Sequence, residues 1–170
     1  MPEFWDLYDI NRNKLERLHE RGVTLNNGEY HLVVEVWVVN SSNKILLTQR
    51  HPNKPWGSYW ECTGGSVIAG EDGFVGAKRE LLEETGIKII DEQIVFLGMF
   101  TYNDWITETY LVKIDIPIDN LKLQYEEVIN AKWVDTNEFE DMCAKELIVP
   151  STKYRFNFYR DKILPAINSK

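Results

Sequence analysis

The segment from Gly64 to Ile87 constrains the fold more than any other part of the sequence, because a glycine-rich stretch leads into a strongly patterned helix. At about 100° per residue, the apolar side chains of the second part fall on one stripe of a helix. These side chains are Phe74, Ala77, Leu81 and Leu82. Gly86 then supplies a residue that tolerates the positive φ of a helix end. The pattern therefore predicts a helix over residues 73–85.

Three carboxylates on this helix share one arc. Glu80, Glu83 and Glu84 lie within about 100° of one another, on the side away from the apolar stripe. The cluster has two interpretations: a solvated acidic face, or a site for a hard divalent cation, which takes oxygen ligands from carboxylates and substrate phosphates. The glycines Gly64 and Gly65 favour the second interpretation, since backbone without a side chain lets a ligand approach closely.

The same segment resembles the Nudix box, the signature of a superfamily of hydrolases. The box reads Gly, five residues, Glu, seven residues, Arg-Glu, an aliphatic residue, any residue, Glu-Glu, any residue, Gly and an aliphatic residue. Every fixed position is matched in this sequence. The matching residues are Gly65, Glu71, Arg79, Glu80, Leu81, Glu83, Glu84, Gly86 and Ile87.

The resemblance implies an α/β (α+β) architecture, the Nudix fold, in which a mixed β-sheet is sandwiched between helices. It also implies a divalent-metal-dependent hydrolase, using Mg²⁺ or Mn²⁺, that cleaves a diphosphate bond in a nucleoside diphosphate linked to another group. By position, the carboxylates of Glu80, Glu83 and Glu84 and the carbonyl of Gly65 match the metal ligands. Arg79 matches the residue that orients these carboxylates, and Glu83 and Arg79 are thereby also catalytic candidates.

A general base is expected outside the box, because many family members use a glutamate in a loop shortly before a strand. Here Glu126 and Glu127 precede the strand candidate that includes Lys132 and Trp133. Glu127 is the preferred candidate, with Glu126 and Glu108 as alternatives. The number of metal ions remains open.

Outside the box the chain resembles the isopentenyl diphosphate isomerase-like branch of the superfamily. Isomerases of that branch carry a catalytic cysteine just before the box and a histidine just after it, where this chain has Gly64 and Ser66. Cys62 lies two residues away from the cysteine position, whereas His31 matches one family histidine, with its role left open. Two alternatives to hydrolysis follow: isomerase-like activity, and a non-catalytic nucleotide-binding Nudix domain. The motifs that carry this likeness are Tyr30–Val33, Leu47–Arg50, Pro55–Trp60 and the opening Phe4–Asp9.

The rest of the chain reads as a single domain over residues 1–170, with a core at about 30–136, a short added strand at the amino terminus and helices over 137–165. Runs of β-branched and alternating residues predict the strands, and 3.6-residue periodicity predicts the helices. The expected strands are 32–39 and 44–49, joined as a hairpin, then 94–102, 107–114 and 131–134; beyond them helices are expected at 137–145 and 153–164. Tyr154 and Phe158 mark turns of the last helix and are expected in the core.

Composition excludes several classes of protein. The 170 residues carry a formal net charge of −8, which argues against a protein that grips nucleic-acid polymers. The apolar run at 94–100 is too short to span a bilayer, and the first residues lack the pattern of a signal peptide. Two cysteines form no disulfide framework. We expect a cytoplasmic enzyme with a small-molecule diphosphate substrate and no membrane or nucleic-acid partner; whether it forms a homodimer is left open.

The sequence indicates less about the group linked to the diphosphate than about the diphosphate itself. Several aromatic residues are available either to stack on a base and line an apolar pocket or to fill the core. They are Trp37, Trp56, Tyr59, Trp60, Tyr102 and Trp105. Arg50 and Lys54 lie between the predicted hairpin and the box, where they would meet phosphate or simply be exposed.

Overall fold

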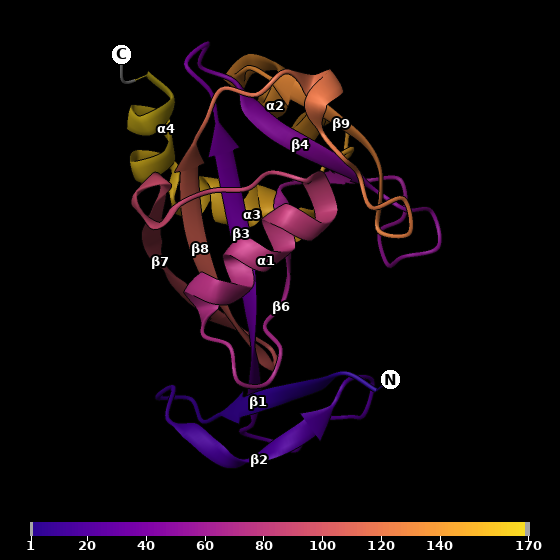
Figure 1. The fold of residues 1–170 in the computed structure, drawn as a ribbon, viewed down its shortest axis with the longest axis vertical. Helices are drawn as coiled ribbons and strands as arrows, with labels where there is room; N and C mark the ends of the chain where they lie inside the picture. The colour runs from indigo at the N-terminus through magenta and orange to yellow at the C-terminus, as the bar shows by residue number, and fades with distance from the viewer. Residues whose placement is uncertain (1, 169–170) are drawn as a thin grey trace.

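The structure is a computed structural model that describes residues 2–168; the ends of the predicted 1–170 domain, residues 1, 169 and 170, lie outside the described part. Within that part, a mixed sheet separates one helix from three others, and a two-stranded hairpin continues this sheet at its lower end (Figure 1). The predicted architecture, a mixed sheet sandwiched between helices, is confirmed. The strands are β1 (Phe4–Tyr8), β2 (Lys14–Glu20), β3 (Tyr30–Val39), β4 (Ile45–Arg50), β5 (Trp60–Glu61), β6 (Thr63–Ser66), β7 (Ile94–Tyr102), β8 (Trp105–Lys113) and β9 (Val128–Val134).

Strand β3 is the centre of the sheet and is buried on both faces. Its β-branched residues suit a strand without a solvated side. Val34, Val36 and Val38 pack on the side of helix α1 (Gly73–Thr85), whereas Trp37 and Val39 pack on the opposite side. The alternation along one strand therefore builds two separate hydrophobic cores.

The neighbours of β3 place the segment before α1 beside the middle of the sheet. Strand β8 runs parallel to β3 over its length, from His31 opposite Trp105 to Val39 opposite Lys113. Strand β6 pairs antiparallel with β3 on its other side, so that Gly65 lies opposite Val34. Strand β7 pairs with β8, and β4 pairs with β5 and β9.

The predicted hairpin between the strands at 32–39 and 44–49 forms only at its turn. Val39 pairs with Ile45, and beyond this pair the two strands diverge to different partners. The strand predicted at 131–134 begins earlier, at Val128, because it pairs with the whole of β4. The added strand at the amino terminus is confirmed as β1, which forms a hairpin with β2.

Helix α1 has the bounds that its sequence predicts. The side chain of Asp72 caps the first turn by accepting a hydrogen bond from the amide of Val75 at 2.9 Å, and Gly86 ends the helix with φ of 74°. Two predictions on its faces are wrong. Leu82, expected in the apolar stripe, is exposed, and Glu84, expected on the side away from the core, is buried.

The carboxy-terminal helices are α2 (Thr136–Ala144), α3 (Pro150–Phe158) and α4 (Arg160–Asn168). The single helix predicted over 153–164 is wrong, since one helix ends at Phe158 and a second begins at Arg160, and both pack on the same core. Phe156 and Ile163 then point into the core, while Tyr154 and Phe158, expected there, lie on the surface. No helix among the described residues is long and apolar enough to cross a membrane.

Candidate functional site

The carboxylate of Glu80 lies directly against the backbone of Gly65. A β-carbon placed on Gly65 would lie 2.5 Å from the Glu80 carboxylate carbon, which is closer than real β-carbons approach other atoms. The pairing of β6 with β3 holds this glycine in place above the second half of α1. The glycine therefore provides space for the acidic side chain of Glu80, whereas the sequence pattern predicted that it lets a ligand approach the backbone.

Glu84 is the most enclosed carboxylate of the helix, with 4% of its surface exposed. Burial raises its pKa well above the usual value, and the negative charges of Glu61 and Glu80 raise it further; a hydrogen bond from the Gly64 amide opposes this only in part. Burial also raises the pKa of Glu80, despite the adjacent Arg79. Desolvation therefore makes both carboxylates harder to ionise than exposed ones.

Arg79 connects the acidic residues of the segment. Its Nε donates to Glu71 at 3.0 Å, and its Nη1 donates to Glu80 at 2.7 Å and to Glu83 at 2.9 Å. Its Nη2 donates to the carbonyl of Ser66 at 2.9 Å, so the side chain also fixes the start of the loop. Burial alone would lower the pKa of Arg79, but the carboxylates around it raise it, which keeps the guanidinium charged. This geometry supports the orienting role expected for Arg79.

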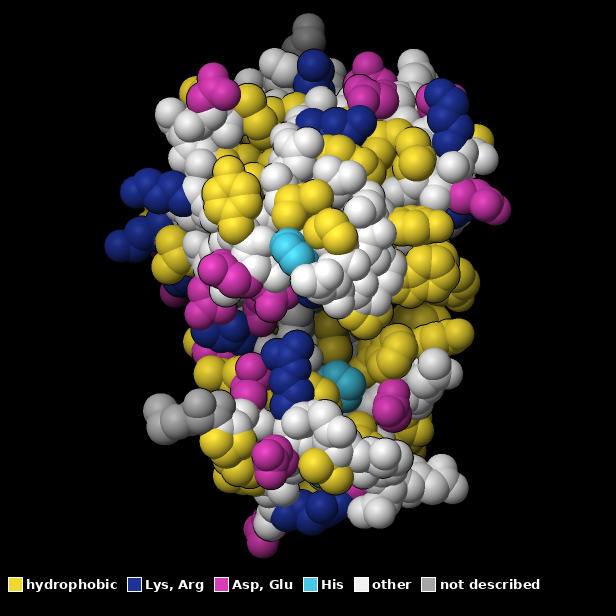
Figure 2. All heavy atoms as spheres, turned by 90° about the vertical axis from the view of Figure 1, so that its right-hand side faces the viewer, with side chains coloured by type: hydrophobic (Ala, Val, Ile, Leu, Met, Phe, Trp, Pro, Cys, Tyr) yellow, Lys and Arg dark blue, Asp and Glu magenta, His cyan; other side chains and the backbone are white. Residues whose placement is uncertain are grey.

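Two basic residues, Arg50 at the end of β4 and Lys54 in the loop after it, pair with carboxylates in this part of the fold. Arg50 pairs with Glu61 through an Nη1 to Oε1 contact of 2.5 Å, and Lys54 pairs with Glu127. Lys54 also acts electrostatically on Glu84 and Glu61. The preferred base candidate, Glu127, thus pairs with a lysine whose charge also acts on Glu84. Figure 2 shows charged side chains of both signs on the left of one face of the molecule, and hydrophobic side chains along its right.

A group of buried polar side chains around Glu35 borders a cleft that Arg50 and Lys54 also line. The thiol of Cys62 donates to Glu35 at 2.9 Å, and the guanidinium of Arg155, on α3, pairs with the other oxygen of Glu35. Burial raises the pKa of the Cys62 thiol well above its usual value, as does the charge of Glu35. The cleft has a volume of about 210 Å³, and its walls include Gly64, Gly65, Arg50, Lys54, Glu61 and Arg155.

Sequence reasoning missed Glu35, Glu61 and Arg155. None of them belongs to a motif, and they meet only because β3, β5 and α3 come together in the fold. A glutamate in the middle of the apolar run of β3 was the one available signal, since a buried carboxylate requires a partner. The partner, Arg155, lies 120 residues further along the chain.

The other base candidates lie elsewhere. Glu108 receives a hydrogen bond from Tyr110 at 2.6 Å, pairs with Arg12 and lies against Gly73, at the opposite end of α1 from Glu84. Eleven residues of helix separate the two ends by about 16 Å. Glu126 is exposed. Of the three candidates, only Glu127 is placed next to a side chain that also acts on Glu84.

His31 lies away from the helix glutamates, between β1 and β8. Its ring stacks on Trp5 with the centroids 4.0 Å apart, and burial lowers its pKa. Gly64 and Ser66, which stand at the isomerase cysteine and histidine positions, are part of β6. Cys62 is buried beside Glu35 and does not take the place of the isomerase cysteine, whose position is held by Gly64.

The residues present suit a divalent cation. Hard cations bind carboxylate and carbonyl oxygens, and here the Glu80 carboxylate lies against the backbone of Gly65 while Glu84 accepts a hydrogen bond from the amide of the neighbouring Gly64. Within residues 2–168, no three acidic, histidine or cysteine side chains already converge at the spacing of metal ligands. Arg79 donates hydrogen bonds to Glu80 and Glu83. A cation at these carboxylates would therefore either bind beside Arg79 or replace its hydrogen bonds.

Comparison with known proteins gives the family. The family model described as NUDIX domain matches residues 29–154. The chain is 31% identical over 150 residues to an uncharacterized Nudix hydrolase of Listeria monocytogenes, covering 87% of this chain and 89% of the relative. Among solved structures, a protein of Deinococcus radiodurans superposes with a TM-score of 0.73 at 18% identity, covering 86% of this chain and 92% of that one.

A second solved structure is a bifunctional NMN adenylyltransferase/ADP ribose pyrophosphatase of Francisella tularensis, complexed with AMP and a manganese ion. It superposes with a TM-score of 0.66 at 19% identity, over 79% of this chain and 42% of that one. At such identity the likeness concerns the fold alone. The matched family model, the Listeria relative and the complete box together show that this chain belongs to the Nudix hydrolase family.

Proposed function

We propose that the chain is a divalent-metal-dependent hydrolase that cleaves a diphosphate bond in a nucleoside diphosphate linked to another group. One observation carries the proposal: the Glu80 carboxylate lies against the backbone of Gly65, and the buried Glu84 carboxylate, four residues further along the helix, carries a second negative charge that interacts with it. Such an arrangement destabilises the protein unless a cation joins it. A divalent ion supplied with the substrate removes this cost.

Glu80, Glu84 and Glu83, with the carbonyl of Gly65, would hold Mg²⁺ or Mn²⁺. When bound, the ion shields the negative charge of the diphosphate and lowers the pKa of a coordinated water. Arg79 keeps the carboxylates oriented through its bonds to Glu80 and Glu83. The net charge of −8 is thus compatible with an anionic substrate, because the local charge is reversed by metal.

We assign Glu127 as the general base that takes a proton from the attacking water. It lies in the loop before β9, where its carboxylate pairs with Lys54, and a general base must reach the attacking water from such a position beside the site. Arg50 and Lys54 both line the walls of the cleft, where cationic side chains would contact the diphosphate oxygens. The Francisella neighbour, with its AMP and manganese ion, supports this class of substrate as an analogy of fold.

The test is a hydrolysis panel of nucleoside diphosphate derivatives with Mg²⁺, Mn²⁺ or a chelator, followed by detection of phosphate and nucleotide products. We expect metal-dependent turnover that Glu84→Gln reduces at least about 100-fold. Glu92→Gln is the matched control, since it makes the same change at an exposed site and should retain the wild-type rate.

Three results would contradict the proposal. They are no turnover across the panel, turnover in the presence of chelator, and Glu84→Gln with the same rate as wild type. Conversion of isopentenyl diphosphate without hydrolysis would assign the isomerase-like activity instead. Nucleotide binding without turnover would assign the non-catalytic alternative.

A further inference from the structure

The amino-terminal hairpin of β1 and β2 precedes residues 29–154, the part of the chain that the family model matches. It is nevertheless attached directly to the loop between β6 and α1, which reaches down to β1 in Figure 1. The amide of Ala69 donates to the carbonyl of Phe4 at 2.8 Å, and the amide of Gly70 donates to the carboxylate of Asp6, also at 2.8 Å. Two backbone amides of the Nudix box therefore fix the hairpin relative to the box.

Arg21 directly follows β2 and closes the open end of the hairpin. Its amide donates to the carbonyl of Glu3 at 2.9 Å, and its Nη1 donates to the two carboxylate oxygens of Glu3 at 3.0 Å and 3.1 Å. Burial raises the pKa of Glu80, and the charge of Glu3 adds to this effect. The ion pair of Arg21 and Glu3 therefore lies within electrostatic reach of a proposed metal ligand.

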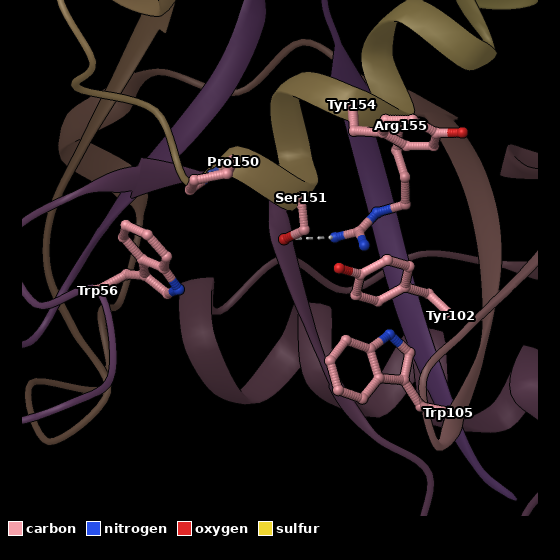
Figure 3. Close-up of a pocket in the computed structure, with 7 residues that line it drawn as sticks. All are labelled: Trp56, Tyr102, Trp105, Pro150, Ser151, Tyr154 and Arg155. Carbon is pink, nitrogen blue, oxygen red and sulfur yellow. Dashed lines mark hydrogen bonds between the residues drawn. The ribbon is translucent and has the colours of Figure 1, made fainter.

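Arg21 also lines the cleft that contains Gly65. The other cationic side chains that line this cleft are Arg50, Lys54 and Arg155. Figure 3 shows the guanidinium of Arg155 extending from α3, with Ser151 beside it. Cationic side chains thus reach the cleft from the hairpin, from the end of β4 and the loop after it, and from α3.

Cations outnumber carboxylates in the lining of the cleft. The ion pairs formed within the lining are those of Arg155 with Glu35 and of Arg50 with Glu61. The partners of the two other cations, Arg21 and Lys54, lie outside the lining. The lining therefore has an excess of positive charge, which suits an anionic ligand.

Arg21 is available to such a ligand. Its side chain is 56% exposed and that of Glu3 is 36% exposed, and an ion pair between exposed side chains contributes little free energy. Its Nε and Nη2 have no hydrogen-bond partner among the residues that the structure describes. A phosphate group accepts two parallel hydrogen bonds from one guanidinium. Exchange of Glu3 for a phosphate would therefore replace a weak contact by a stronger one.

From these contacts we infer that Arg21 is a substrate-binding residue, which donates hydrogen bonds to a phosphate group of the substrate in the cleft. The hairpin thereby supplies part of the binding site from outside the matched domain. The inference rests on the hydrolysis proposed above and adds a contact that the Nudix box does not contain. Loss of Arg21 removes no metal ligand, so it should raise KM more than it lowers kcat.

The test measures binding of imidodiphosphate, a diphosphate with a nitrogen bridge that resists hydrolysis, by calorimetry at saturating Mg²⁺. Arg21→Gln should weaken this binding at least about five-fold, since it removes a hydrogen bond between charged groups. Arg17→Gln is the matched control, because Arg17 lies on the same hairpin, is 44% exposed and pairs with Glu29 outside the cleft. Its affinity should stay within about two-fold of wild type. Circular dichroism confirms that each variant is folded.

Glu3→Gln separates substrate binding from a structural role of the ion pair. It breaks the same pair as Arg21→Gln does but leaves the guanidinium in place. If Arg21 binds the substrate, Glu3→Gln should bind imidodiphosphate as tightly as wild type or more tightly. An equal loss of affinity in Glu3→Gln and Arg21→Gln would assign the pair a structural role and overturn the inference.

The remaining outcomes separate this inference from the proposed hydrolysis. Turnover that depends on Glu84, together with equal affinities of Arg21→Gln and wild type, would overturn the inference and leave hydrolysis standing. Weaker binding in Arg21→Gln alone, in a protein that hydrolyses no compound of the panel, would support the inference and refute hydrolysis. No binding of imidodiphosphate to wild type would overturn the inference. So would a loss in Arg17→Gln as large as that in Arg21→Gln.

Discussion

The close approach of Glu80 to Gly65 gives a sharp prediction for Gly65→Ala. A β-carbon at this position would lie 2.5 Å from the carboxylate, whereas ordinary contact begins at 3.4 Å. The carboxylate must therefore withdraw by about 0.9 Å, and the atoms that move are the end of a flexible side chain rather than backbone. The substitution displaces one proposed metal ligand while leaving its charge in place.

The expected effect falls on activity rather than on stability. A displacement of about 1 Å in a reacting group costs on the order of 100-fold in rate, or about 2.7 kcal/mol of transition-state stabilisation. The free energy of unfolding should change by less than about 1 kcal/mol, since alanine also restricts the unfolded chain and offsets part of the disturbance of Glu80. Initial rates with saturating Mg²⁺ and urea unfolding measure the two quantities on the same protein.

Substitution of the neighbouring Gly64 is the control, because it should affect the stability of the protein more strongly than substitution of Gly65 does. A β-carbon on Gly64 would lie 2.3 Å from the carbonyl oxygen of Val34, which is backbone of the central strand and cannot withdraw alone. Gly64→Ala should therefore lower the free energy of unfolding by more than Gly65→Ala does. If Gly65→Ala kept a rate within three-fold of wild type, or lost as much stability as Gly64→Ala, the placement of Glu80 against Gly65 would be refuted.

Three further predictions follow from the geometry. Glu127→Gln should lower kcat by about 10²–10⁴-fold without loss of folding, as measured by steady-state kinetics, if this carboxylate is the base. Asp72→Ala should lower the free energy of unfolding by about 1 kcal/mol in urea titrations, because the first turn of α1 loses its cap. Burial lowers the pKa of His31, so the unfolded chain binds its proton first as the pH falls below about 6.5. Unfolding free energy should therefore decrease from pH 7 to pH 5, and His31→Leu should reduce this dependence.

Each of these predictions has an outcome that contradicts it. A Glu127→Gln rate within two-fold of wild type would remove this residue from the mechanism. Equal stability of Asp72→Ala and wild type would show that the cap contributes nothing. A pH dependence that His31→Leu leaves unchanged would assign the titration to another group.

The sequence was sufficient for the local features of the site. The bounds of α1 were predictable because its cap, its closing glycine and its periodicity all lie within one short segment. The same holds for Arg79, whose carboxylate partners lie within eight residues of it on either side. Local spacing fixes such contacts once the helix forms.

The features that depended on distant contacts were not predictable. Glu84 was expected on the open side of the helix, but its side chain is buried, and this burial raises its pKa. The break at Tyr159 was likewise not predicted, and the core contacts of the two helices are made by Phe156 and Ile163 while Tyr154 lies on the surface. Tertiary packing overrides periodicity when a short helix has no strongly apolar face.

Metal affinity tests the central claim most directly, because the buried carboxylates are the reason for expecting a cation at all. Binding of Mn²⁺ to wild type and to Glu84→Gln is measured by calorimetry in the absence of substrate, with Glu92→Gln as control. The expected result is saturable binding to wild type and to the control, and an affinity at least about ten-fold weaker in Glu84→Gln. Equal affinity for Mn²⁺ in Glu84→Gln and wild type would show that Glu84 holds no metal, and would contradict the proposed reaction site.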